Sequence, residues 1–137
     1  MRLSMGILLT TIVFSSTFTF ANDELNDIMK KMGRDFKTLT KQINDPNQNI
    51  SSTQLAENIS TLMKSAVNEV PDSVANLAPA DQPAALAEFQ NEIKKVMAEI
   101  DQMIVALKAS DNAMATSILN LVAQQKKDAH NKFDPKP

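Results

Sequence analysis

Two side chains in this chain of 137 residues could act together as ligands of a transition metal. The one histidine is His130, and Met29 is among the eight methionines. The imidazole of histidine is the commonest protein ligand of metals, and the thioether of methionine is a softer one. Most of the chain separates the two residues, so they can share a metal only if the fold brings them together.

Four amphipathic helices are predicted from the apolar pattern. Apolar residues recur at steps of three and four, which is the spacing of helical faces packed against one another. The predicted faces are Leu25, Met29, Met32, Phe36, Leu39 and Ile43; then Leu55, Ile59, Leu62 or Met63, and Ala66; then Leu86, Phe89, Ile93, Val96, Ile100, Met103 and Leu107; and finally Ile118, Leu119, Val122, Ala123, Lys126, Ala129, His130 and Phe133.

The segments between these helices contain breakers and capping residues. They are Asn44-Asp45-Pro46, a predicted capping box of Ser51 and Gln54, a loop over 71–82, Pro83 at the start of the third helix, and a capping turn at Ser110-Asp111-Asn112. No segment alternates with a period of two, so the fold is predicted to be all-α. Two short links favour an antiparallel, up-down-up-down four-helix bundle, with a crossover through the longer middle link as the alternative.

In that topology the start of the first helix and the end of the fourth lie at the same end of the bundle. Met29 and His130 could then face each other and occupy the two axial positions of an iron porphyrin. Such a pair favours a high reduction potential and leaves no position for a substrate, so the expected chemistry is electron transfer. The same residues have an alternative interpretation that needs no metal. A histidine near the end of a helix is favoured at the surface by the negative end of the helix dipole, and methionines on an apolar face fill the core.

Residues 1–21 have the features of a cleaved export signal: Arg2, an apolar run, and the ending Thr19-Phe20-Ala21. The mature domain is therefore predicted as residues 22–137, in the bacterial periplasm or secreted. It would carry 13 basic and 16 acidic residues, a net charge of −3 without the basic excess of nucleic-acid-binding proteins. The chain has no cysteine, which excludes disulfides, thiolate metal sites and covalently attached haem.

Several segments resemble the cytochrome b562 family of periplasmic haem proteins. They are Leu25-x-Asp27-x-Met29-x-x-Met32, Leu62-Met63-Lys64-x-Ala66, Phe89-x-x-x-Ile93 with Ile100-Asp101, and Ala129-His130-x-x-Phe133. The resemblance implies a four-helix bundle that transfers electrons through one non-covalent haem b. It places the axial ligands on Met29 and His130. The chain departs from the family pattern at two positions. It has Lys126 where the family frequently has arginine, and Ala129 where the family has an aromatic residue.

Further haem contacts are predicted around the two ligands: Met32, Gly33, Phe36, Met63, Phe89, Ile93, Val122 and Lys126. Gly33, the only glycine of the mature chain, could make room for the porphyrin edge or reflect tolerated surface variation. Lys126 could pair with a haem propionate or extend from the apolar face to water. The apolar residues would line a bundle core with or without haem.

Enzymatic sites are not expected. One histidine cannot supply the two Glu-x-x-His pairs of a di-iron bundle, and it lacks the motifs of a zinc hydrolase or a Ser-His-Asp triad. The runs Lys30-Lys31, Lys94-Lys95 and Lys126-Lys127 are interpreted as solvated surface, with a docking patch for a redox partner as the alternative. The expected partners are haem and unidentified periplasmic redox proteins, with a monomer and no membrane anchor after cleavage. The alternative is a haem-free periplasmic bundle that acts as a binding or stress-related module.

Overall fold

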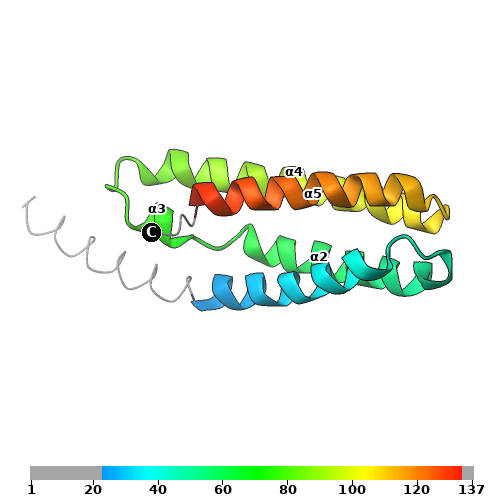
Figure 1. The fold of residues 1–137 in the computed structure, drawn as a ribbon. Coiled ribbons are helices and arrows are strands. Elements are labelled where there is room, and N and C mark those ends of the chain that lie inside the picture. The colour runs from blue at the N-terminus through cyan, green and yellow to red at the C-terminus, as the bar shows by residue number, and fades with distance from the viewer. Residues whose placement is uncertain (1–22, 134–137) are drawn as a thin grey trace, which may run out of the picture.

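The computed structural model describes residues 23–133, and every regular element in that range is helical. A first helix over residues 23–42 precedes the 3-10 turn η1 (Pro46–Gln48), α2 (Asn49–Ala66), α3 (Asp72–Ala75), α4 (Gln82–Lys108) and α5 (Asn112–Phe133). Figure 1 shows the pair α4 and α5 packed along the pair formed by the first helix and α2. None of the described helices has the length and apolarity needed to cross a bilayer. The predicted export signal, residues 1–21, lies outside the described residues.

Contacts at one end of the molecule join the end of α2, the start of α4 and the end of α5. Lys132, in the last turn of α5, forms an ion pair with Glu88 near the start of α4. The side-chain amide of Gln90 donates to the carbonyl of Val67, which directly follows α2, at 3.3 Å. We call this the site end, because the last turns of α5 contain His130.

Contacts at the opposite end join the remaining helix termini. The side-chain amide of Asn112, the first residue of α5, donates to the carbonyl of Ile43, directly after the first helix, at 2.8 Å. The same amide donates to the side-chain oxygen of Asn49, the first residue of α2, at 2.7 Å. Lys108 at the end of α4 pairs with Glu57 in the middle of α2 at 3.5 Å. The first helix and α5 therefore approach each other tail to head at this end.

The core consists of one face from each long helix, and the apolar pattern predicts most of it. Met29 is an exception: it is 38% exposed, and Ile28 takes the buried position beside it. Three-four spacing from Leu25 permits either residue at the edge of the apolar face, and the helix buries Ile28. Ala123 and Lys126, predicted on the face of the last helix, are exposed. The buried cluster is Leu25, Ile28, Met32, Leu39, Ile43, Ala56, Ile59, Met63, Ala66, Phe89, Val96, Ile100, Met103, Ala106, Leu107, Ala115, Ile118, Leu119 and Val122.

The predicted capping box at Ser51 and Gln54 is wrong. The second long helix begins earlier, at Asn49, without a side-chain cap. Because η1 runs directly into α2, the N–H of Asn49 donates to the carbonyl of Pro46, and helical bonding has already begun. Ser51 instead accepts a hydrogen bond from the side chain of Gln42 in the first helix, at 2.9 Å.

The segment predicted as a loop over 71–82 contains the short helix α3. Pro71 precedes α3 in an extended conformation, and Val74 is 2% exposed. This helix contacts both α4 and α5, so it covers the site end of the bundle (Figure 1). Four residues are too few to show a helical period, which is why the sequence pattern does not predict it.

Glu69, just beyond α2, has a carboxyl group whose protonation depends on the fold. Burial raises the pKa of Glu69 above its ordinary value, and the negative charge of Glu24 in the first helix raises it further. Figure 1 also shows the start of the first helix at the site end.

This pKa shift predicts a pH-dependent effect of Glu69→Gln. The folded state holds the proton more tightly than the unfolded chain, so stability from Glu69 is fully present below its unfolded pKa and is lost as pH rises through the raised folded value. We expect Glu69→Gln to be more stable than wild type near pH 7 and equal to it near pH 3.5, by urea unfolding. Glu57→Gln, which removes the ion pair with Lys108, should not stabilise; a gain there equal to that of Glu69→Gln would contradict the explanation.

The turn between α4 and α5 contains a left-handed residue, Ser110, with φ of 58°. Its N–H donates to the carbonyl of Leu107 at 3.1 Å, and the N–H of Asp111 donates to that of Ala106 at 2.8 Å. These are the two bonds of a Schellman motif, whose left-handed position is usually glycine. Asp111 also accepts from the N–H of Met114 at 3.0 Å, which confirms the predicted capping turn.

We expect Ser110→Gly to raise the free energy of unfolding by about 0.5 to 1 kcal/mol, because glycine adopts this conformation without the clash of a Cβ atom. Urea unfolding measures the change. Ser110→Ala keeps the Cβ and should stay within about 0.5 kcal/mol of wild type. Equal stabilisation by both substitutions would contradict the role of the backbone.

Candidate functional site

The candidate site lies along the flank of the first helix that faces α5. Met29 and Gly33 are one turn apart, and Phe36 follows at the next helical step, so the three share this flank. Met29 is 38% exposed and Phe36 is partly buried against the core. The flank is therefore a border between core and solvent rather than part of the sealed interior.

Lys126 connects α5 to this flank. Its ammonium nitrogen lies 5.1 Å from the centre of the Phe36 ring, a distance typical of a cation–π interaction, worth about 0.5–1 kcal/mol at an exposed site. Lys126 lies one helical turn before His130. The contact therefore brings the region of α5 that carries the predicted ligand against the region of the first helix that carries Met29.

His130 lies in the last turns of α5. Its side chain, like that of Phe133, lies outside the described part of the structure, so ligation by His130 stays a prediction. The backbone position is consistent with the predicted geometry, because Lys126 and Lys132 on either side of it contact the first helix and the start of α4.

Gly33 faces open space. A Cβ atom built on it would meet no heavy atom within 4 Å apart from the helix itself. The glycine is therefore not required by close packing in the described structure, and its φ is not positive. A helix-interior glycine without such a reason destabilises the helix by about 1 kcal/mol relative to alanine.

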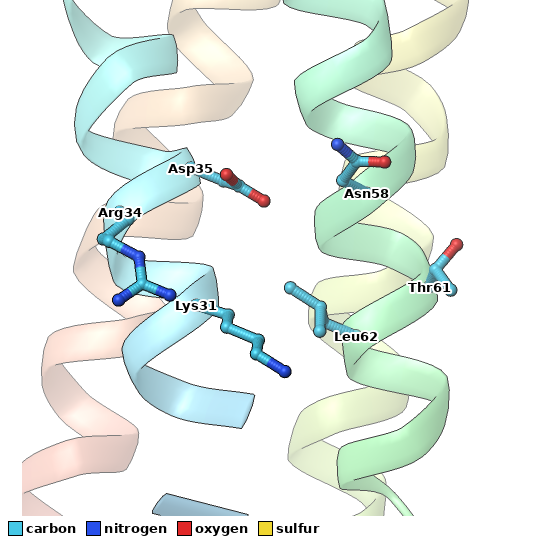
Figure 2. Close-up of a pocket in the computed structure, with 6 residues that line it drawn as sticks. All are labelled: Lys31, Arg34, Asp35, Asn58, Thr61 and Leu62. Carbon is cyan, nitrogen blue, oxygen red and sulfur yellow. The ribbon is translucent and has the colours of Figure 1, made fainter. Parts of the chain in front are cut away.

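A surface groove of about 370 Å³ lies on the other flank of the first helix, toward α2. In Figure 2, Lys31 and Asp35 extend from the first helix toward α2. The lining is Lys31, Arg34, Asp35, Asn58, Thr61 and Leu62. Five of these six residues are charged or polar. None of the predicted haem contacts belongs to the groove, so it is separate from the candidate site.

The family model of cytochrome b562 matches residues 24–134, which include both predicted ligands. The chain belongs to the cytochrome b562 family. Comparisons with curated proteins and with solved structures gave no match. The cytochrome b562 family consists of helical bundles that bind haem b non-covalently and carry electrons, and it is not typically enzymatic.

The residues around Met29 fit the haem of the cytochrome b562 family. One flank of the first helix carries, in order, the accessible thioether of Met29, the open space at Gly33 and the partly buried ring of Phe36. The predicted apolar contacts belong to one cluster with this flank. Met32, Met63, Phe89 and Val122 are buried in it, and Phe36 and Ile93 pack partly buried against it.

Two features of this site are not determined by the sequence pattern. The contact between Lys126 and Phe36 depends on how two helices are rotated about their axes, which a periodic pattern does not fix. The open space at Gly33 likewise depends on what the neighbouring helix places there. A lone glycine in a helical segment was the only available signal for it.

Proposed function

We propose that this protein is a soluble periplasmic electron carrier that binds one haem b non-covalently, with Met29 and His130 as axial ligands. In this proposal residues 1–21 are removed on export. The four long helices form an antiparallel, up-down-up-down bundle, and the haem lies between the first helix and α5 at the site end.

The contact between Lys126 and Phe36 is the observation that carries the proposal. At the far end of the same two helices, Asn112 bonds the backbone at Ile43. Two contacts in reversed order along the chain support an antiparallel pairing of the first helix with α5. That pairing favours a position of Met29 opposite the last turns of α5, where His130 lies.

In the proposed site each residue has a distinct task. The Met29 sulfur and one imidazole nitrogen of His130 would hold the haem iron, and the bound haem would supply one-electron redox chemistry whose potential this ligand pair raises. Met32, Phe36 and Val122 exclude water from the apolar faces. Lys126 carries an exposed positive charge at the border of the site, where it would neutralise a propionate.

Titration of the purified protein with haemin tests this proposal. The expected result is a stoichiometric complex with sharp low-spin absorption bands in both oxidised and reduced states. Absence of any spectral shift would overturn the proposal in favour of a haem-free bundle that serves as a binding or stress-related module.

Gly33 offers a second test, because two explanations of this glycine predict different outcomes. We expect Gly33→Ala to stabilise the haem-free protein by up to about 1 kcal/mol, since the added methyl group meets open space and alanine favours helix. We expect Gly33→Leu, which fills that space, to weaken haemin binding by at least about tenfold, or 1.4 kcal/mol. Urea unfolding and haemin titration measure the two effects. Unchanged haemin affinity in Gly33→Leu would indicate that the glycine reflects only tolerated surface variation.

A further inference from the structure

The outward face of the first helix carries a row of cationic side chains, which we call the basic stripe: Lys30, Arg34, Lys37 and Lys41. All four are exposed. Steps of four, three and four residues place them on one side of the helix, along about 16 Å of its length. The stripe faces away from the buried positions of the same helix.

The stripe has no partner in the described part of the chain. None of its four side chains forms an ion pair with another described residue. The neighbouring Lys31, by contrast, pairs with Asp27 at 3.1 Å. Like charges at this spacing destabilise a helix by roughly 0.2–0.5 kcal/mol per pair, and no ion pair among the described residues offsets this cost.

The net charge of the chain gives no indication of the stripe, because basic and acidic residues are unevenly distributed. Residues 30–41 contain five basic residues and one acid, a net charge of +4. The other residues of 22–137 contain eight basic residues and fifteen acids, a net charge of −7. Residues 22–137 therefore have a positive face on a strongly negative body, although their total charge of −3 suggests a uniformly acidic surface.

We infer that the basic stripe is a docking surface for a partner protein that presents a matching row of carboxylates. Opposed charges of this kind accelerate encounter and fix the orientation of two proteins. The acidic body limits contact to the stripe and disfavours a rigid or planar polyanion that extends beyond it, such as duplex DNA or an anionic membrane.

The chemistry of the face also argues against a membrane. Helices that bind membrane surfaces need an apolar face exposed for insertion. The apolar face of the first helix is buried in the bundle. Among the described residues of this helix, Met29 is the only large hydrophobic residue that is exposed. Between the basic residues lies Thr38, whose hydroxyl bonds back to the carbonyl of Arg34 at 3.2 Å.

The stripe adjoins the candidate site. Gly33 is next to Arg34 in the chain and lies one turn from both Met29 and Lys37, so it separates the stripe from the proposed ligand. A docked partner would therefore lie beside the edge of the haem. This location alone rests on the proposed function; the docking itself does not.

The experiment uses the full-chain protein, first without haem and then after haemin titration, with poly-L-glutamate as the acidic probe. Calorimetric titration at low salt compares wild type with Arg34→Glu/Lys37→Glu and with the control Lys94→Glu/Lys95→Glu. The control residues are exposed on α4, so both variants change the net charge equally. We expect the stripe variant to lose at least about tenfold in affinity and the control less than about threefold. Binding of poly-L-glutamate by the wild type should be weaker at about 0.15 M salt than at low salt.

Equal losses in the two variants, or no binding of poly-L-glutamate by wild type, would overturn the inference. Tighter binding to phosphatidylglycerol vesicles or to duplex DNA at the same salt would also overturn it. A stripe-dependent dimer in sedimentation would do the same, since the occupant would then be a second copy. Stripe-dependent binding in a protein that takes up no haemin would support the docking surface and overturn only the proposed function.

Discussion

Replacing His130 with alanine is expected to abolish the low-spin absorption bands of the haemin-loaded protein, and Met29→Ala is expected to do the same. Each substitution removes one proposed axial ligand. Loss of a residue that merely supports a metal ligand already weakens binding by about 10- to 100-fold, so loss of a ligand should weaken haemin binding by at least about 100-fold, or 2.7 kcal/mol. The chain has no cysteine to retain the haem covalently. Haemin titration with oxidised and reduced spectra measures the effect.

Met114→Ala is the matched control for Met29→Ala. Met114 is a methionine that is 53% exposed near the start of α5, at the end opposite the candidate site. Its removal should leave the absorption bands unchanged. Since Met29 is also exposed, Met29→Ala should keep the stability of the haem-free protein within about 0.5 kcal/mol of wild type, so a lost spectrum would not reflect unfolding. Retention of the bands in both ligand variants would contradict the proposed ligation.

The buried faces of the helices were predictable because burial repeats along a helix with its turn. Ile59, Ile100 and Leu107 are all buried as their spacing predicts. The pattern has a resolution of about one residue at the edge of a face, and there it placed Met29 in the core where Ile28 lies. A residue that ligates haem has to lie at such an edge, because a side chain in the centre of the core cannot reach a haem bound at the boundary between core and solvent.

Features that depend on the meeting of two elements were not predictable. Ser51 looked like a helix cap because a cap is a local pattern, yet η1 continues into α2 and Gln42 of the first helix uses the hydroxyl instead. The basic stripe was present in the sequence as a repeating charge. The sequence prediction grouped Lys30 only with its neighbour Lys31, and the total charge averages the stripe with the acidic residues of the other helices.

The second large effect concerns the scaffold, and two isoleucines provide a matched pair. Ile100 in α4 is 0% exposed, whereas Ile50 at the start of α2 is 81% exposed. We expect Ile100→Ala to lower the free energy of unfolding by about 2–5 kcal/mol, because the substitution removes buried methyl groups and leaves a cavity. Ile50→Ala should change it by less than about 0.5 kcal/mol. Thermal and urea unfolding of the haem-free variants measure both; similar losses would contradict the described core.

Haemin added to the same variants separates the scaffold from the site. A ligand at about 100 times its dissociation constant stabilises the folded state by about 2.7 kcal/mol. Ile100 lies in the half of α4 away from the site end, so haemin should add this increment to wild type and to Ile100→Ala alike, although the variant starts from a lower stability. His130→Ala should start near wild type and gain almost nothing. If Ile100→Ala lost the increment while still folded, haem binding would depend on the whole core rather than on the site end.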